Sequence, residues 1–502
     1  MDELVIEKVD SVNLRVRCER GTAKELSDFF TFKVPGHKFM PQYKNKMWDG
    51  TIKLYNIYSQ LLYCGLLDYV YKFAKDRNYT VKVENTDDFA KLNLITKDTV
   101  NDYIVNRLQP ISNDVLLKPH EHQVNAITHA INNDRCLLLS PTASGKSLII
   151  YTLIRYYMER IPEDKKILII VPTTSLVSQM YSDFMEYSHV DKTFDTEKEV
   201  HVVFAGRDKT SKSAKIIIST WQSIYKLPNE YFEQYHAVFG DECHLFKSKS
   251  LTTLMTKLMD CPYRIGTTGT LDGTQTHKLV IEGLFGPVHN VITTKELMDK
   301  KILASLEIDA ILLKYRKKDI EEVKRAKYQD EIKWLIKNEK RNNFIKNMAL
   351  NLKGNTLILF QFVDEHGKVL YNMLKDTVNE ERKVFFVYGG TDVEVREEIR
   401  HIVEKNNDAI IVASYGTFST GISIRKLHNI IFASPSKSRI RVLQSIGRQL
   451  RKSESKEVAK LYDIGDDLSW KSYKNHTLRH FSERIKIYKT EKFKYNSVLI
   501  RI

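Results

Sequence analysis

The sequence alternates short apolar runs with amphipathic stretches, and this pattern fills two long blocks of the chain. In the first block, from about residue 114 to residue 287, turn-forming residues bound each run, and a helical pattern follows most of them. Such alternation is typical of a parallel sheet whose strands are joined by helices. The predicted strands are residues 136–139, 166–171, 200–204, 215–219, 237–239 and 263–266.

The same pattern restarts after residue 304. A polar segment, residues 319–352, lies between the first two runs of this block and predicts a long helix or a helix pair. Two blocks in series predict an α/β protein with two tandem parallel-sheet lobes. The predicted strands of the second block are residues 306–314, 355–360, 383–388, 408–413, 428–433 and 458–464.

The two ends of the chain differ from these blocks. Residues 1–95 are rich in aromatic and β-branched residues, with turn signals at residues 34–36 and 49–50, which predicts a small α/β domain. A length of 502 residues agrees with about three units at ~150 residues each. We therefore predict an N-terminal domain at 1–95, a first lobe at 96–295, a second lobe at 296–465 and a basic helix/strand extension at 466–502.

Charge and cysteine content narrow the class of protein. The formal net charge is +15, with a pI near 9.2, which favours a polyanionic partner. The N-terminus is acidic and short of apolar residues, and no run is long enough to cross a membrane, so we expect a cytoplasmic protein without a membrane partner, in the host cytoplasm if a phage encodes it. Scattered cysteines without a CxxC pair argue against zinc and disulfides; they are Cys18, Cys64, Cys136, Cys243 and Cys261.

A phosphate-binding loop is the strongest local signal. Residues 140–147 read Ser-Pro-Thr-Ala-Ser-Gly-Lys-Ser between an apolar run and a helical one, where backbone N–H groups converge on a phosphate at a helix N-terminus. In this pattern Lys146 reaches the β- and γ-phosphates, and the Ser147 hydroxyl binds Mg²⁺. Ser140 replaces the usual first glycine, which we expect to be tolerated because only backbone geometry matters there. An ordinary Ser/Gly-rich turn is the alternative reading of this loop taken alone.

An acidic pair strengthens the prediction of a nucleotide site. Asp241 and Glu242 come directly after an apolar run in the same block as the loop. At a strand end, Asp241 can hold Mg²⁺, and Glu242 can orient and deprotonate the attacking water. Alone, such a pair is usually a solvated surface pair. Cys243 is expected to be a small packing residue rather than a nucleophile.

Together with these two motifs, further segments resemble the superfamily-two helicases of the DExH/D group, over residues ~115 to ~465. Residues 241–244 read Asp-Glu-Cys-His, residues 266–270 Gly-Thr-Thr-Gly-Thr, and residues 444–451 Gln-Ser-Ile-Gly-Arg-Gln-Leu-Arg. The resemblance implies two RecA-like lobes that use ATP and Mg²⁺. It also implies arginine fingers at Arg448 and Arg451, which stabilise transition-state charge and are worth ~10³–10⁵ in rate elsewhere. Without it, the last motif would read as a basic surface helix.

The resemblance implies a role for each matching residue. Gln123 would read adenine, and Gly421 and Gln444 would belong to the nucleotide site. The phosphate loop comprises Ser140, Pro141, Thr142, Ala143, Ser144, Gly145, Lys146 and Ser147. The residues that would couple hydrolysis to lobe movement are His244, Thr268, Gly269 and Thr270. The residues of both lobes that would contact the nucleic-acid strand are Pro172, Thr173, Thr220, Gln222, Gln361, Phe362, Gly389 and Thr417.

Within the superfamily, the chain resembles the phage UvsW-type helicases of the XPB-like branch, which share a PG…P…K…WDG stretch at residues 35–50. This resemblance implies remodelling of branched or duplex DNA, including fork regression, Holliday-junction branch migration and R-loop unwinding on an RNA–DNA hybrid. Lysines alternate with aromatic residues there, so Lys44, Lys46 and Trp48 are candidate DNA contacts. A small domain core with solvated lysines is the equally weighted alternative.

The last segment of the chain is basic. Lys and Arg outnumber Glu from residue 469 to residue 502, and a helical pattern over 477–488 predicts one docked face and one basic face. We therefore predict nucleic-acid contacts from Arg479 and Arg484, with a plain solvated face as the alternative. Two other functions stay open: an RNA helicase or double-strand DNA translocase on the same core, and an annealing protein whose affinity ATP gates.

Overall fold

The computed structural model describes residues 3–89, 94–204, 206–246, 248–271, 274–379, 381–421, 424, 426–434, 438–450 and 457–502. It divides into two compact units, one formed by Met1–Ser140 with Ser144–Val291 and the other by Pro141–Ala143 with Ile292–Ile502. No helix among the described residues is long and apolar enough to cross a membrane.

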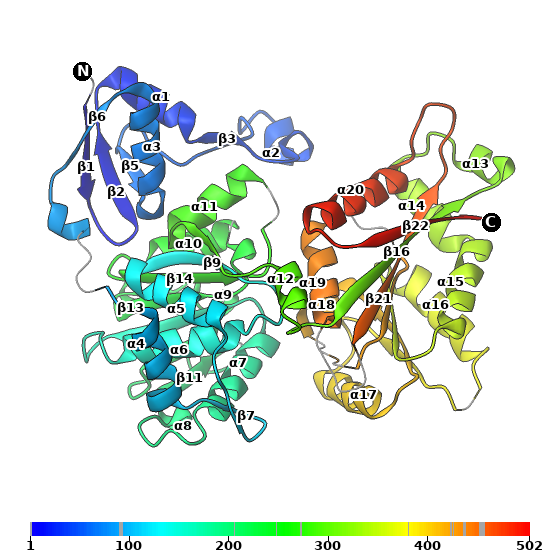
Figure 1. Cartoon of the computed structure of the whole chain (residues 1–502). Coiled ribbons are helices and arrows are strands. Elements are labelled where there is room, and N and C mark those ends of the chain that lie inside the picture. Colours follow the sequence, from blue (N-terminus) through cyan, green and yellow to red (C-terminus); the bar gives the residue numbers. More distant parts are fainter. Residues whose placement is uncertain are drawn as a thin grey trace. The chain divides into compact units, whose positions relative to one another are not determined.

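A four-stranded sheet begins the first unit (Figure 1). Helices α1 (Arg20–Phe29) and α3 (Leu67–Arg77) bury their apolar faces against it, with Phe30 and Phe73 fully buried in the shared core. The strands, in spatial order, are β5 (Leu61–Tyr63), β2 (Asn13–Arg17), β1 (Glu3–Lys8) and β6 (Thr80–Val83). A separate antiparallel pair, β3 (Thr31–Lys33) and β4 (Thr51–Lys53), leaves this domain with α2 (Pro41–Lys44) between its strands.

The first lobe contains a seven-stranded sheet in which every neighbouring pair is parallel. All six predicted strands of this block are present, and β15 is an additional short strand that the apolar pattern missed. The spatial order is β11 (Val200–Val203), β12 (Ile216–Thr220), β10 (Lys166–Val171), β13 (Tyr235–Gly240), β14 (Tyr263–Thr268), β9 (Arg135–Leu139) and β15 (Val288–Asn290).

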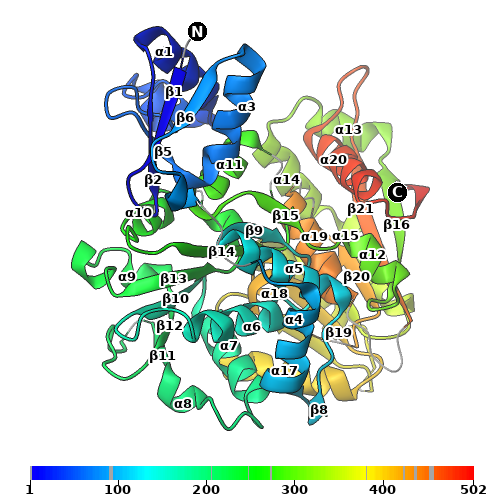
Figure 2. The ribbon, with the colours of Figure 1, turned by 60° about the vertical axis from the view of Figure 1, so that its left-hand side comes forward.

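Helices cover both faces of this sheet, which is why its strands are continuous apolar runs. Figure 2 shows α6 and α7 on one side and α10 and α11 on the other. The helices are α4 (Lys97–Asp102), α5 (Glu121–Asn133), α6 (Lys146–Met158), α7 (Thr174–Tyr187), α8 (Thr196–Glu199), α9 (Trp221–Ile224), α10 (Lys249–Thr256) and α11 (Gln275–Phe285). A two-stranded ribbon of β7 (Ile111–Ser112) and β8 (Val115–Leu116) precedes α5.

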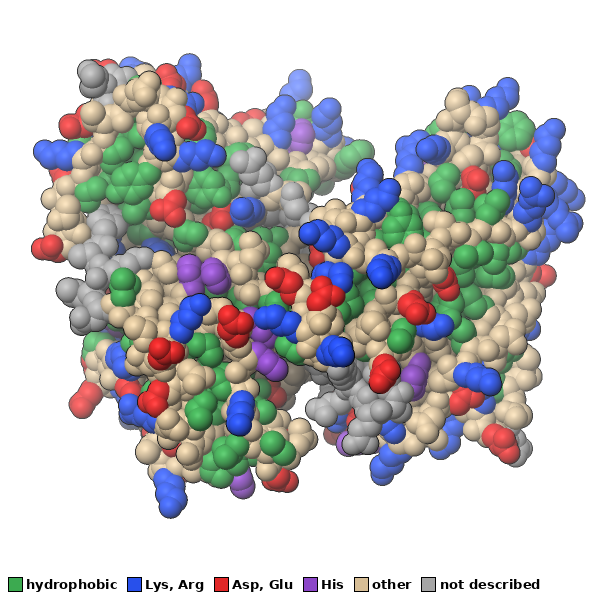
Figure 3. All heavy atoms as spheres, in the orientation of Figure 1, with side chains coloured by type: hydrophobic (Ala, Val, Ile, Leu, Met, Phe, Trp, Pro, Cys, Tyr) green, Lys and Arg blue, Asp and Glu red, His purple; other side chains and the backbone are tan. Residues whose placement is uncertain are grey.

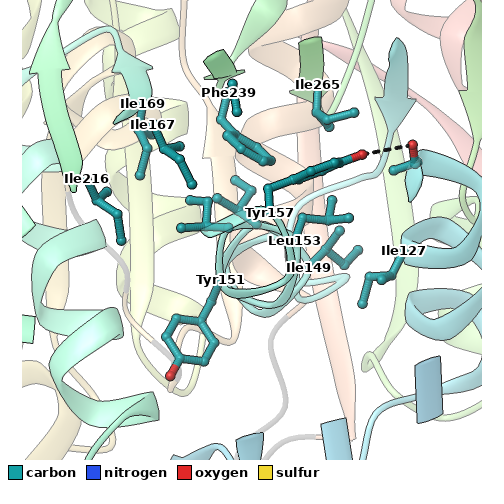
Figure 4. Close-up of a cluster of buried hydrophobic side chains, with 14 of the residues drawn as sticks. Ile127, Ile149, Tyr151, Leu153, Tyr157, Ile167, Ile169, Ile216, Phe239 and Ile265 are labelled. Atoms are coloured by element: carbon teal, nitrogen blue, oxygen red, sulfur yellow. Dashed lines mark hydrogen bonds between the residues drawn. The ribbon is translucent and has the colours of Figure 1, made fainter. Parts of the chain in front are cut away.

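Helix α6 is the centre of the core on one face of the sheet. Tyr157 points from α6 toward Phe239 and Ile265 of the sheet, and its hydroxyl donates to the Ala130 carbonyl on α5 at 3.4 Å (Figure 4). Fixing α6 in this way fixes the loop that precedes its first turn.

The second lobe repeats the architecture with another seven-stranded sheet, parallel at every neighbouring pair. The predicted fold class, α/β with two parallel-sheet lobes and a small N-terminal domain, is confirmed. The spatial order is β18 (Val384–Val387), β19 (Ile410–Ser414), β17 (Thr356–Phe360), β20 (Asn429–Phe432), β21 (Val458–Asp467), β16 (Ser305–Lys314) and β22 (Tyr495–Arg501).

The polar segment at 319–352 forms parts of three helices rather than one or two, because Lys324–Lys327 and Asn338 leave the helical conformation. The helices of this unit are α12 (Thr294–Asp299), α13 (Lys317–Val323), α14 (Tyr328–Lys337), α15 (Glu339–Asn351), α16 (Lys368–Lys375), α17 (Val393–Lys405), α18 (Tyr415–Gly421), α19 (Arg439–Gln449) and α20 (His476–Thr490).

The basic C-terminal segment is integrated into this lobe. Strand β22 pairs with β16, and α20 packs against β21 through Phe481 and Tyr488. Arg484 lies on this buried face and is only 1% exposed; its Nε is 2.9 Å from both carboxylate oxygens of Asp463. The prediction that Arg484 contacts nucleic acid is therefore wrong: the helical pattern places it on the docked face, where a buried carboxylate neutralises it.

Removing this guanidinium should destabilise the fold, because Asp463 would be left as a buried charge without a counter-charge. We expect Arg484→Met to lower the free energy of unfolding by about 3–5 kcal/mol. Arg479→Met is the control, since Arg479 is exposed on the same helix, and it should cost less than about 1 kcal/mol. Urea unfolding followed by circular dichroism measures both; equal midpoints for the two variants would contradict the assignment.

Candidate functional site

Three neighbouring strands of the first lobe end at one edge of the sheet, and each is followed by one of the predicted motifs. Strands β13, β14 and β9 are adjacent and parallel, so their carboxyl ends meet. The phosphate loop follows β9, Asp241 follows β13, and Thr268 ends β14. A backbone hydrogen bond of 2.9 Å from Ser140 N–H to the Thr268 carbonyl joins two of these segments.

The loop has the backbone that a phosphate cradle requires. Ala143 (φ +65°) and Gly145 (φ +82°) adopt left-handed conformations, and α6 begins at Lys146 directly after them. The left-handed conformation favours glycine at position 145, and an added Cβ would also lie 2.0 Å from Nε2 of Gln123, so that the Gln123 amide would have to move.

Ser140, by contrast, is not in a left-handed conformation. Its hydroxyl is fully buried and lies 2.5 Å from the Ser144 hydroxyl, so the side chain crosses the base of the loop. The Lys146 ammonium donates to the Ser140 carbonyl at 3.3 Å. The backbone at this position therefore does not require the glycine that Ser140 replaces.

Gln123 lies behind the loop, 4% exposed. Its Oε1 accepts from the His120 N–H at 2.8 Å, which completes a capping box at the start of α5, and its Nε2 donates to the Ser144 carbonyl at 3.2 Å. His122 Nε2 is 3.0 Å from the same carbonyl. Gln123 thus positions the loop, and its role toward adenine stays a prediction. His120 and His122 were missed as loop supports, although both stand in the segment that was singled out.

Asp241 is held in a buried network. Its Oδ1 accepts from the Thr267 hydroxyl at 2.8 Å and from the Glu242 N–H at 2.9 Å. Burial raises the pKa of the Asp241 carboxyl and the Glu242 carboxylate adds to the rise, whereas the Lys146 ammonium and the Thr267 hydrogen bond oppose it. The acid and the loop lysine therefore act on each other, as one nucleotide site requires. Thr267 was not predicted as a site residue, because the resemblance assigned the roles in this motif to the neighbouring Thr268, Gly269 and Thr270.

Glu242 begins a second network that leads away from Asp241. Its backbone is left-handed (φ +51°), and its Oε2 lies 3.2 Å from Nδ1 of His244. The same Nδ1 is 3.2 Å from the Thr268 hydroxyl, which donates to the Thr270 carbonyl at 3.0 Å. Since the one hydroxyl hydrogen goes to Thr270, Nδ1 must carry the hydrogen in the contact with Thr268. His244 thus lies between the Glu242 carboxylate and Thr268 at the end of β14. Gly269 lies between Thr268 and Thr270 in the sequence.

The candidate strand contacts of the first lobe meet at the same edge of the sheet. Gln222 Nε2 donates to the Pro172 carbonyl at 3.3 Å, so the segments after β10 and β12 lie together. Thr173 caps α7, and the Thr220 hydroxyl is 2.9 Å from Ser223 Oγ. Of this set, Gln222 is exposed, whereas Thr173 is half-buried and Thr220 is buried.

In the second lobe, the candidates also follow strand ends. Gln361 and Gly389 are exposed after β17 and β18, and Phe362 is half-buried. Thr417 is buried, with its hydroxyl 2.7 Å from Ser414 Oγ, which disfavours a direct contact with a nucleic-acid strand.

Helix α19 carries the last motif. Gln444 and Arg448 are half-buried and lie four residues apart, hence on one helical face. Gly421 ends α18. The prediction for Arg451 falls outside the described residues.

Comparisons with known proteins match three separate parts of the chain. Three family models match: the N-terminal domain of the DNA helicase UvsW at residues 4–84, the res subunit of type III restriction enzymes at 116–273, and the conserved C-terminal helicase domain at 339–453. The ATP-dependent DNA helicase uvsW of Enterobacteria phage T4 is 36% identical over 499 residues, and the match covers 97% of each chain.

The chain belongs to the UvsW family of superfamily-two helicases. The crystal structure of T4 UvsW covers 99% of both chains with a TM-score of 0.53 and 32% identity. The DNA 3'-5' translocase XPB2 of Sulfurisphaera tokodaii is 23% identical over 365 residues, covering 66% of this chain and 79% of that protein. The resemblance to UvsW-type helicases predicted from the motifs is confirmed.

The predicted DNA contacts of the UvsW-type N-terminal segment differ in their exposure to solvent. Lys44 and Lys46 are exposed. Trp48 is half-buried, and its ring N–H donates to the Thr51 carbonyl at 2.7 Å, so it stabilises its own segment. Arg479 on α20 is exposed, with its guanidinium 5.2 Å from the Tyr473 ring centroid.

Thr267 and Thr268 are adjacent, equally buried and differently connected, so they separate two functions of the site. We expect Thr267→Val to raise the pKa of Asp241 further, because a hydrogen bond to the charged form is lost; the acidic limb of the ATPase pH profile should then move to higher pH. Thr268→Val should leave the acidic limb in place. It should instead lower the amount of DNA that is unwound for each ATP hydrolysed. Identical profiles for both variants would contradict this separation.

Proposed function

We propose that this UvsW-family chain is an ATP-dependent DNA helicase that remodels branched DNA in recombination and repair, by fork regression, Holliday-junction branch migration and R-loop unwinding. The observation that carries the proposal is the meeting of Lys146, Asp241 and the His244–Thr268 contact at one edge of one sheet. A passive binding or annealing module has no use for a buried hydrolytic acid linked to the adjoining strand.

The residues fit Mg²⁺ as well as ATP. Magnesium prefers oxygen ligands and is usually held by one or two protein groups together with substrate phosphates. The buried Asp241 carboxylate and the Ser147 hydroxyl in the first turn of α6 are such groups. The ion would supply charge neutralisation at the β- and γ-phosphates.

The chain's own groups then divide the work of hydrolysis. Backbone N–H groups of the loop and the Lys146 ammonium bind the phosphates. Glu242 orients the attacking water and accepts its proton as the bond to the γ-phosphate breaks. We propose that Arg448 and Arg451 of the second lobe stabilise the transition-state charge, so that loss of the γ-phosphate releases one lobe from the other.

The proposed substrate is gripped mainly at its backbone. Contacts from Gln222, Gln361 and Gly389 at strand ends would hold sugar and phosphate groups, which carry no sequence information. We therefore expect activity on DNA of any sequence, with branched substrates distinguished by shape. ATPase stimulation by forks, Holliday junctions, R-loops, linear duplex and RNA compares this proposal with an RNA helicase or a plain duplex translocase; strongest stimulation by RNA or by linear duplex would overturn it.

Lys146→Ala and Glu242→Gln should each abolish DNA-stimulated ATP hydrolysis, because one removes phosphate binding and the other the base. Salt-sensitive DNA binding should remain largely intact in both variants. Lys198→Ala, at an exposed lysine of α8 in the same lobe, should hydrolyse ATP at the wild-type rate. DNA-stimulated ATP hydrolysis at the wild-type rate in Lys146→Ala or in Glu242→Gln would contradict the proposal.

Arg451→Ala should lower kcat by about 10³-fold or more and weaken ATP binding far less, since a finger acts on charge that develops in the transition state. Steady-state ATPase kinetics at saturating DNA separate kcat from KM. A large rise in KM at unchanged kcat would assign Arg451 to ground-state binding instead.

A further inference from the structure

The antiparallel pair β3–β4 and the residues between its strands form an arm, residues 31–53, that leaves the N-terminal domain. Its base is defined by the ladder register, with Phe32 opposite Ile52, and by a hydrogen bond from the Val34 N–H to the Gly50 carbonyl at 2.8 Å. A 3₁₀ turn, His37–Phe39, and α2 form its outer end.

The arm has an internal packing of its own. The His37 ring fills the space beside Gly50, where an added Cβ would lie 2.5 Å from the ring, and it makes an edge contact with Tyr43 at 4.8 Å between centroids. His37 Nδ1 is 2.9 Å from the Val34 carbonyl, and the Trp48 ring N–H is bonded to the Thr51 carbonyl. The outer end of the arm is therefore held by contacts within the arm, whereas its base packs on the domain through Phe32 and through the Thr31 hydroxyl, which donates to the Ser27 carbonyl at 2.6 Å.

Three large apolar side chains of the arm remain outside this packing. Phe39 is 81% exposed, Met47 is 78% exposed and Met40 is 40% exposed. Backbone hydrogen bonds fix their positions, from Met40 N–H to the His37 carbonyl and from Met47 N–H to the Gln42 carbonyl. A rigid segment that presents such side chains to water indicates a binding surface.

The charge around these side chains indicates the kind of ligand. Lys38, Lys44 and Lys46 are exposed and make no ion pair within the described part of the chain. Asp49 is the one acidic residue of the arm. Its carboxylate accepts hydrogen bonds from the Thr51 N–H and hydroxyl, and it forms an ion pair with Lys53 at 3.9 Å. Figure 3 shows basic side chains beside hydrophobic ones over the arm, and the basic residues of the arm are all lysines. Lysines beside an exposed aromatic ring match a ligand with phosphates and flat apolar faces.

We propose that Phe39, with Met40 and Met47, contacts the faces of unpaired bases at a DNA branch while Lys44 and Lys46 bind the adjoining phosphates. The proposal rests on the proposed function and adds a base-contacting site to it. Every base has an apolar face, so stacking on Phe39 requires no particular sequence. Trp48 does not take this part, because the packing of the arm uses it.

The first experiment measures base contact directly with the full-length protein. A fork carries 2-aminopurine as the first unpaired base at the branch, and wild-type binding should change its fluorescence through altered stacking. Phe39→Ala should abolish that change and weaken fork binding roughly 5-fold to 100-fold, the range of one lost stacking contact. Phe39→Trp should retain both. Tyr58→Ala is the control: Tyr58 is 98% exposed in the same domain but outside the arm, and its removal should alter neither signal.

Salt dependence separates the apolar side chains from the lysines. Phe39→Ala should lower fork affinity by the same factor at every salt concentration, since no counterion release is lost. The double variant Lys44→Gln/Lys46→Gln should instead reduce the slope of log affinity against log salt by about 0.7–0.9 per lysine. Circular dichroism establishes that each variant is folded.

Wild-type fork affinity and fluorescence in Phe39→Ala would overturn this inference, and so would an equal effect of Tyr58→Ala. If the arm instead binds a protein partner, Phe39→Ala should bind forks and change the fluorescence as the wild type does. If wild-type protein hydrolyses ATP in response to DNA while Phe39→Ala binds forks normally, the inference alone fails; if the wild type shows no such hydrolysis, the proposed function fails.

Discussion

Parallel pairing of β13, β14 and β9 is the constraint on which the candidate site depends, because parallel neighbours must end at the same edge of their sheet. The phosphate loop, Asp241 and Thr268 are far apart in sequence, yet each needs only to follow its own strand to reach the others. The buried face of α6, which includes Ile149, Leu153 and Tyr157, holds that helix against the sheet. The loop is then supported from behind by α5 through Gln123 and His122.

Buried arginines attach helices to the sheets in both lobes. In the first lobe, Arg264 is fully buried and donates to the carbonyls of Met255, Leu258 and Leu284, near the C-terminal ends of α10 and α11, where helix dipoles favour a cation. Burial without a carboxylate partner lowers the pKa of Arg264 to about 10, which still leaves it charged at neutral pH. In the second lobe, Arg341 binds Asp466 and the Ala433 carbonyl. Each of these arginines therefore ties helix ends or a helix to the sheet within its own lobe.

The N-terminal domain is fixed to the first lobe by close contacts. The Tyr69 hydroxyl donates to the Glu282 carboxylate at 2.8 Å, and Gly65 approaches the Glu282 backbone so closely that an added Cβ would lie 1.9 Å from its carbonyl oxygen. Arg135, at the start of β9, also donates to the Ser11 carbonyl. The arm with Phe39 is thus carried by the unit that contains Lys146 and Asp241. A base contact made there would be tied to the lobe that binds the phosphates.

The sequence by itself determined the two parallel sheets and predicted the candidate nucleotide site, because strands buried on both faces are continuous apolar runs and short motifs mark the turns that follow them. It missed β15 and did not foresee that the strand of the C-terminal extension, β22, pairs with β16, because the residues of both strands are polar or exposed at a sheet edge, where pairing rather than burial defines the strand. Only the tertiary structure decided that Arg484 is buried against Asp463, that Thr267 holds Asp241, and that Trp48 is packed while Phe39 is exposed. Composition and periodicity give the side chains that one element can bury; which partner each one meets depends on neighbours that are distant in sequence.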